Sequence, residues 1–291
     1  MVQRARGSNG GKRRSRSLTL RINNKRLGIM PFFNRDGQKL WYVDTGNATG
    51  PTVVFSHGFL MDGSMFATNI EALRGDFRCI AWDQRGFGQT GAVDEPFSFW
   101  DSARDLLALL DHLEIGSAAL VGMSQGGFLS MRAALLEPDR VRALGLISTR
   151  AGVDEQPVID SFTQLKRTWA DSGAALVAEP LRSLLIGGDF DASKWTRAWH
   201  QMRRAGFEHP VDALTGRDDL TPRLQDITCP AIVFHGSVDP AIDIAHGRSL
   251  ANGLPNTKGF VTVDGAGHAP NLTHPQFVNG PLREFLLRYT G

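Results

Sequence analysis

Short apolar runs alternate with amphipathic segments along much of this chain. Apolar and β-branched runs predict buried strands at 40–44, 52–56, 77–82, 118–123, 141–147, 231–235 and 259–263. Apolar residues spaced three or four positions apart predict helices at 65–73, 101–113, 125–136, 243–252 and 276–289. Such alternation builds a mostly parallel sheet with helices on both faces, so the chain is predicted to be an α/β protein.

The alternation is interrupted once. Residues 151–222 contain helical stretches but no convincing strand, and this segment is too long for a plain loop. We therefore predict a helical cap at 151–222, inserted between two parts of one α/β core, 35–150 and 223–291. Residues 1–34 are predicted to be a basic, disordered extension.

Composition narrows the class of protein. With 291 residues, 42% of them hydrophobic and 21% charged, the chain can fill a sizeable core. No apolar run approaches the ~18 residues of a membrane span, and no targeting peptide is evident. Cys79 and Cys229 are too few for a disulfide framework or a four-cysteine metal site. We expect no metal, no cofactor and a cytoplasmic protein, and no oligomeric state is predicted.

Positive charge is concentrated at the amino terminus. Residues 1–35 carry ten Lys or Arg and no acid, which leaves the rest of the chain at about −8. A basic arm can bind nucleic acid or a membrane surface. The simpler interpretation is an extension in which residues 1–29 serve neither folding nor chemistry, and no nucleic-acid partner is expected.

The strongest chemical motif is a G-x-S-x-G sequence at Gly122–Gly126, between a predicted strand and a predicted helix. A serine at such a tight turn is held in a strained conformation that exposes its hydroxyl. Small neighbours let the strand and the helix approach each other, and the helix N-terminus adds backbone donors. Ser124 is therefore the candidate nucleophile.

A serine hydroxyl needs a base, and the base needs an orienting acid. His268 follows the last predicted strand and is flanked by small residues. Asp239 follows the preceding strand, at the same end of the sheet, and Asp264 ranks second as the acid. Ser124, Asp239 and His268 occur in the nucleophile–acid–base order expected for a serine on an elbow of this kind.

Acyl transfer also requires donors for the oxyanion. The backbone N–H of Gln125, directly after the candidate nucleophile, is one candidate. The other is the N–H of Phe59, in the loop after the predicted strand 52–56. The Phe59 side chain is expected to form part of the pocket wall.

Taken together, these motifs resemble the α/β-hydrolase fold family over residues 35–290. They are His57–Phe59, Asp83–Gly88, Gly122–Gly127, Gly236–Asp239 and Gly267–His268, and Ser148–Gly152 resembles the start of the cap in enol-lactonase-like and haloperoxidase-like members. The resemblance implies an eight-stranded, mostly parallel sheet with a helical lid after the sixth strand. Gly86–Gly91 matches a dinucleotide fingerprint by letter, but no helix follows it directly, which argues against that cofactor.

The predicted reaction is hydrolysis of a carboxylic ester or lactone through a serine ester. The partner is then a small-molecule substrate of small to medium size and apolar character. Side chains of the cap and the elbow are expected to bind it: Phe59, Met123, Phe162, Trp169, Leu185, Trp195 and Trp199.

Other functions remain compatible with these residues. Carbon–carbon bond hydrolases and perhydrolases use the same triad, and a carboxylate-binding arginine in the cavity would favour the first. A small-molecule receptor with little turnover can also retain a triad. Halide and epoxide chemistry are disfavoured because those relatives carry Asp where Ser124 stands.

Overall fold

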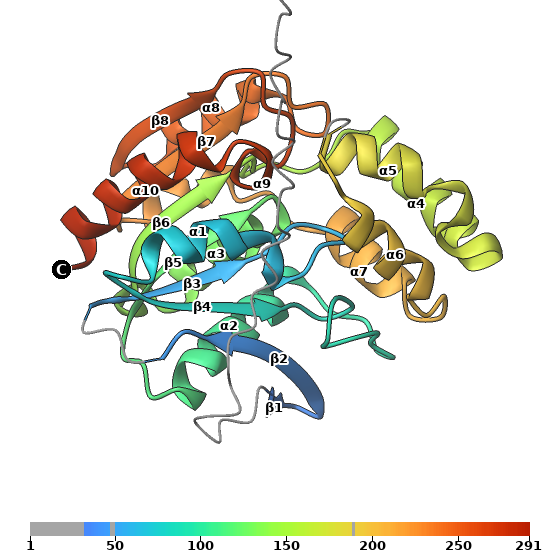
Figure 1. The fold of residues 1–291 in the computed structure, drawn as a ribbon, viewed down its shortest axis with the longest axis horizontal. Helices are drawn as coiled ribbons and strands as arrows, with labels where there is room; N and C mark the ends of the chain where they lie inside the picture. Colours follow the sequence, from blue (N-terminus) through green and yellow to red (C-terminus); the bar gives the residue numbers. More distant parts are fainter. Residues whose placement is uncertain (1–31, 47–49, 188–189) are drawn as a thin grey trace, which may run out of the picture.

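The computed structural model describes residues 32–46, 50–187 and 190–291. One eight-stranded sheet runs through the molecule in the order β1-β2-β4-β3-β5-β6-β7-β8 (Figure 1). The strands are β1 (Phe32–Arg35), β2 (Gln38–Asp44), β3 (Thr52–Ser56), β4 (Arg78–Asp83), β5 (Ala118–Met123), β6 (Val141–Ile147), β7 (Ala231–Gly236) and β8 (Thr257–Val263). Strands β3 to β8 pair in parallel, whereas β2 is antiparallel to β1 and β4. The predicted, mostly parallel eight-stranded sheet is confirmed.

Helices flank the sheet and bury its central strands on both faces. Helix α1 (Ala67–Leu73) contacts α10 (Pro275–Thr290), and α2 (Phe99–His112) contacts α3 (Gln125–Leu136). Every residue of β5 and β7 is buried, as expected for strands that are covered on both sides. This explains why these strands appear in the sequence as continuous apolar runs rather than as alternating ones.

Among the described residues between β6 and β7 there are four α-helices, which we call the cap helices. They are α4 (Gln156–Ser172), α5 (Ala178–Leu185), α6 (Ser193–Gln201) and α7 (Glu208–Thr215). Figure 1 shows them grouped beyond one end of the sheet. As predicted, the described residues between β6 and β7 form helices and turns but no strand.

The remaining helices follow β7 and β8. Helix α8 (Ile244–Gly253) packs on β7 and β8, and the short α9 (Pro270–Thr273) precedes α10. In the part of the chain that the structure describes, no helix combines the length and apolar character that crossing a bilayer requires.

The predicted extension 1–34 overlaps strand β1, so its boundary needs correction. Strand β1 pairs with β2 through a tight turn in which Asp36 and Gly37 both have positive φ, the geometry that Asp-Gly favours in hairpins. Phe33 is buried and stacks on His112 with ring centroids 5.5 Å apart. Residues 32–34 therefore belong to the sheet, and residues 1–31 lie outside the described part.

Candidate active site

Ser124 sits at the turn from β5 into α3 in a strained conformation, with φ of 50° and ψ of −115°. The turn is possible because its neighbours lack side chains. A Cβ on Gly122 would collide with the Gly126 carbonyl, and one on Gly126 would collide with the Ser56 carbonyl. The Thr149 hydroxyl donates to the Ser124 carbonyl at 2.8 Å and helps to fix the turn. The strain therefore accompanies a serine side chain that is aimed away from the sheet.

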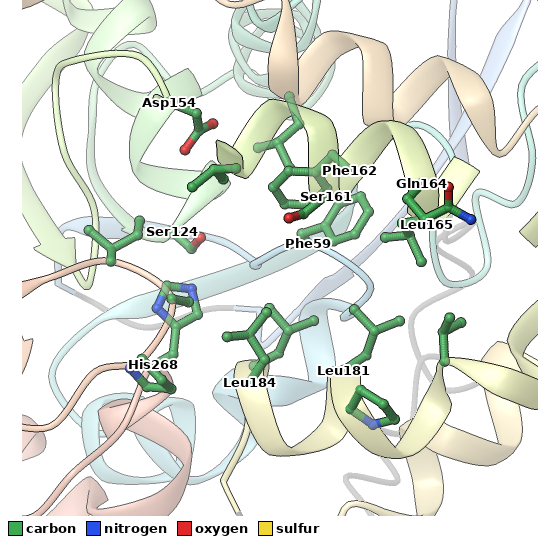
Figure 2. Close-up of a pocket in the computed structure, with 18 of the residues that line it drawn as sticks. Phe59, Ser124, Asp154, Ser161, Phe162, Gln164, Leu165, Leu181, Leu184 and His268 are labelled. Carbon is green, nitrogen blue, oxygen red and sulfur yellow. The ribbon is translucent and has the colours of Figure 1, made fainter. Parts of the chain in front are cut away.

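His268 and Asp239 come from the loops after β8 and β7 and meet in a buried pair. His268 Nδ1 lies 2.9 Å from Oδ2 and 3.1 Å from Oδ1 of Asp239. Figure 2 shows the His268 imidazole beside Ser124 at one end of a cavity, and both residues line that cavity. The second-ranked acid, Asp264, is exposed and has no bond to His268 among the described residues. The structure thus brings the three predicted side chains to one place.

Asp239 is surrounded by donors. The backbone N–H groups of Ala241 and Ile242 donate to Oδ1 at 2.8 and 3.0 Å, and His235 Nε2 lies 3.2 Å from Oδ2. Burial by itself would raise the pKa of Asp239, but His268, His235 and the Ile242 N–H together hold this pKa below its usual range. The carboxylate therefore stays ionised and can orient the His268 ring.

The two backbone N–H groups predicted to bind an oxyanion lie close to Ser124, because Gln125 follows it in the chain and Phe59 lines the same cavity. Among the described residues, the N–H groups of Phe59 and Gln125 have no hydrogen-bond acceptor. Gln84 connects the loops that carry them, because its Nε2 donates to the His57 carbonyl at 2.6 Å and its Oε1 accepts from Gln125 Nε2 at 2.9 Å. From the sequence, Gln84 was expected only as part of the family-like motif Asp83–Gly88, and this connection was not predicted.

His57 braces the same loop as a neutral side chain. Its Nδ1 donates to the Gly58 carbonyl at 2.8 Å, and its Nε2 accepts from the Gln84 N–H at 2.9 Å. Complete burial lowers the pKa of His57 to about 4, and the Gly58 carbonyl offsets only part of that effect. His57 therefore holds the backbone in shape and is not a second catalytic base.

The cavity beside Ser124 has a volume of about 410 Å³ and lies between the core and helices α4 and α5. Three predicted binding residues line it: Phe59, Phe162 and Leu185. Figure 2 also shows Leu165 of α4 opposite Leu181 and Leu184 of α5, so apolar side chains form most of the wall. A cavity of this kind suits an apolar group of small to medium size.

Two other predicted binding residues do not line this cavity, and the prediction is corrected for them. The Met123 thioether packs against Gly58 beneath the elbow. Trp169 is fully buried and stacks on Phe207 with ring centroids 4.0 Å apart. Both side chains belong to the packing that supports the site.

Trp195 and Trp199 also need correction, because they line a different cavity. This second cavity, also about 410 Å³, lies between α6 and the loop that contains Phe87, and neither Ser124 nor His268 borders it. Trp199 Nε1 donates to the Leu60 carbonyl at 2.6 Å, which ties α6 to the core. Helical spacing alone does not reveal which cavity an aromatic side chain faces.

A charged group interrupts the apolar wall near Ser124. Arg150, Asp154 and Arg217 all line the first cavity, and both arginines pair with the Asp154 carboxylate. From the sequence, Arg150 was expected only as part of Ser148–Gly152, the segment that resembles the start of the cap, and no role was predicted for it. Nothing in the sequence around Arg217 indicates that it lines this cavity, because it lies far from Arg150 along the chain.

Comparison with known proteins defines the class of protein to which this chain belongs. Residues 51–275 match the family described as alpha/beta hydrolase fold, and the chain belongs to that family. It is similar to 3-oxoadipate enol-lactonase 2 of Acinetobacter baylyi, with 26% identity over 254 residues that cover 85% of this chain and 93% of that protein.

Two solved structures are also similar. The enol-lactonase from Burkholderia xenovorans LB400 matches with a TM-score of 0.81 and 26% identity, covering 88% of this chain and 100% of that one. A thermophilic esterase from Thermogutta terrifontis matches with a TM-score of 0.77 and 28% identity, covering 90% of this chain and 98% of that one. These relatives are named as enol-lactonases and an esterase, and the two solved structures share the fold described above.

Proposed function

We propose that this chain is a serine hydrolase that cleaves a carboxylic ester or lactone of a small to medium apolar molecule. One observation carries the proposal. A strained elbow serine, Ser124, shares the end of an apolar cavity with His268, and His268 is bonded to the buried Asp239 carboxylate. This is the arrangement that nucleophilic catalysis by a serine requires.

The reaction proceeds in two halves. In the first, Ser124 Oγ attacks the substrate carbonyl carbon while His268 takes the hydroxyl proton, and the N–H groups of Phe59 and Gln125 stabilise the oxyanion. Collapse of the tetrahedral intermediate expels the alcohol, to which His268 returns the proton, and leaves an ester on Ser124. In the second half, water attacks that ester while His268 takes its proton, the bond to Ser124 Oγ breaks, His268 returns the proton to Oγ, and the acid is released. Asp239 holds the imidazole tautomer in both halves.

The named activities of the relatives support the substrate class. An enol-lactonase and an esterase both cleave a carboxylic ester bond, which is cyclic in the first and open in the second. Lactones and simple esters therefore both belong in the first panel of substrates for this chain. The proposed partner is a small molecule, and the reaction uses only side chains, backbone groups and water.

Carbon–carbon bond hydrolysis is the second candidate, because Arg150 and Arg217 line the cavity. An arginine beside the nucleophile can hold a carboxylate of a dienoic diketone and present its ketone to Ser124. This candidate uses the same triad and differs only in the bond that breaks.

The test is turnover of a panel of esters, lactones and dienoic diketones by the wild type and by Ser124→Ala. We expect the wild type to hydrolyse esters or lactones and Ser124→Ala to lose nearly all of that turnover while keeping its fold. Cleavage of the diketones alone would favour the second candidate. Unchanged ester hydrolysis by Ser124→Ala would exclude the proposed mechanism.

A further inference from the structure

Two arginines are buried in the wall of the candidate substrate cavity. The side chain of Arg150 is 8% exposed and that of Arg217 is 1% exposed, yet both line the cavity that contains Ser124. Most of the remaining wall is apolar. A cationic group in such a place is costly unless an anion accompanies it.

The charges of this group do not balance. Asp154, with a side chain 6% exposed, is the one buried acid that pairs with either arginine in the described part of the chain. Glu155 and Asp219, the other acids that act on these arginines, are exposed to solvent. Two guanidinium groups against one buried carboxylate leave an excess of one positive charge at the cavity wall.

The two arginines have different roles within the group. Arg217 donates to the carbonyls of Leu214 at 2.6 Å and Gly152 at 3.2 Å, and its guanidinium lies 4.4 Å from the centre of the Phe128 ring. These contacts fix Arg217 in place. The Nε of each arginine is buried without a partner. Among the described residues, however, Arg150 pairs only with Asp154, whereas Arg217 also donates to two carbonyls. Arg150 therefore has more donors available to a ligand than Arg217.

The backbone places Arg150 next to the nucleophile. Arg150 follows Thr149, whose hydroxyl holds the Ser124 carbonyl at 2.8 Å. Ser148, one residue earlier, is buried and has a positive φ of 44°, an uncommon conformation for a serine. Strain of this kind often occurs where a chain must aim a functional side chain. Figure 2 shows Asp154, the partner of Arg150, at the same end of the cavity as Ser124.

We propose that Arg150, held by Asp154 and supported by Arg217, binds a carboxylate of the substrate. The enzyme then selects esters or lactones whose acyl portion carries a free carboxylate. The excess of one positive charge matches a carboxylate monoanion, and a guanidinium can donate two parallel hydrogen bonds to its oxygens. Burial, with a smaller contribution from Arg217, lowers the pKa of Arg150 to about 10, which still leaves it charged at neutral pH. This inference rests on the proposed serine hydrolase function.

Paired substrates test the inference. Monoethyl esters of straight-chain dicarboxylic acids are compared with ethyl alkanoates of the same chain length, and kcat/KM is measured by titration of released acid. Because a hydrogen-bonded charge contributes strongly, we expect the wild type to prefer the carboxylate member at one best chain length by about tenfold or more. Equal rates, or a preference for the neutral ester at every length, would overturn the inference.

Variants then assign the preference to a residue. Arg150→Gln should reduce the preference about tenfold, because it removes the charge and both parallel donors. Arg150→Lys keeps the charge and should retain part of the preference, which guards against a glutamine variant that folds poorly. Arg167→Gln removes the same charge from the exposed face of α4 and should keep the wild-type preference. A full preference in both Arg150 variants, or an equal loss in Arg167→Gln, would contradict the assignment.

Ser124→Ala separates the two proposals. If that variant is inactive on both substrate types while the wild type shows no preference, carboxylate binding by Arg150 is refuted and the serine mechanism is supported. If the variant retains turnover, the serine mechanism fails first.

Discussion

His235 Nε2 lies 3.2 Å from Oδ2 of Asp239, the oxygen that His268 Nδ1 approaches to 2.9 Å. The same Nε2 lies 2.8 Å from the Ile242 carbonyl, which can only accept, so Nε2 carries the proton. Nδ1 of His235 is buried without a partner among the described residues. His235 therefore presents its Nε2–H to Asp239 and positions the acid of the candidate triad.

Replacing His235 should alter the pH profile as well as the rate. In His235→Leu, Asp239 loses a donor, binds a proton more readily and becomes a stronger partner for protonated His268. We expect kcat to fall about tenfold and the acid limb of kcat/KM to move to higher pH. His235→Gln, whose amide can still donate, should stay nearer the wild type. If the pH dependence of kcat/KM is unchanged in His235→Leu, His235 contributes only to packing.

Gln84 should affect the chemical step more than substrate binding. Gln84→Leu is similar in size but breaks the contacts that join the Phe59 and Gln125 loops. Because oxyanion donors act mainly in the transition state, we expect kcat to fall about tenfold to a hundredfold with KM changed less than about threefold. Steady-state kinetics measure both constants. Gln276→Leu on the exposed face of α10 is the matched control, and a change confined to KM in Gln84→Leu would argue against this role.

His57 should make the protein less stable in mild acid. Its pKa is about 4 in the folded protein and about 6.5 when unfolded, so the unfolded chain binds more protons between these values. The His57 contribution is present above pH 6.5 and is lost as the pH falls towards 4, by about 3 kcal/mol in total. To isolate this contribution, the free energy of unfolding in urea is measured for the wild type and for His57→Gln from pH 4 to pH 7. The wild type should lose more stability than the variant, and parallel curves would refute the assignment.

The Phe59 ring stands between the two cavities. It contacts Phe87, which lines the second cavity, at a centroid distance of 5.6 Å, and Phe162, which lines the first, at 5.8 Å. Phe59→Ala keeps the backbone N–H but removes this wall, at a stability cost of about 3–5 kcal/mol. We expect longer acyl chains to be accepted, as measured by kcat/KM against chain length. Phe162→Ala enlarges only the first cavity, so it should increase the accepted acyl chain length less than Phe59→Ala does. If both variants increase that length equally, the two cavities stay separate in Phe59→Ala.

Hydrophobic spacing was sufficient to predict most of the fold. The seven strands predicted from apolar runs correspond to β2 to β8. Central strands such as β5 and β7 are covered on both faces and are therefore apolar throughout, whereas β2 and β8 are only partly buried. Strand β1 was missed, although Asp36-Gly37 is a strong hairpin signal, because the basic residues around it suggested an extension. A short edge strand carries too few apolar positions to stand out.

The candidate triad was accessible to sequence reasoning because each member follows a strand, and the carboxyl ends of parallel strands meet at one edge of the sheet. The cavity wall was harder to predict. Trp169 and Phe162 lie seven residues apart on α4, yet one supports the core and the other borders the cavity. Which side a cap helix presents depends on its packing against other helices, and that information is not local to its own sequence.

The most direct test of the central claim is the site of covalent modification by a fluorophosphonate, which reacts with activated serine nucleophiles. Peptide mass mapping should place one adduct per chain on Ser124, and the adduct should form far more slowly in His268→Ala. Hydrolysis of the best ester should be lost in proportion to labelling. An adduct on another residue, or full hydrolysis by fully labelled protein, would contradict the account.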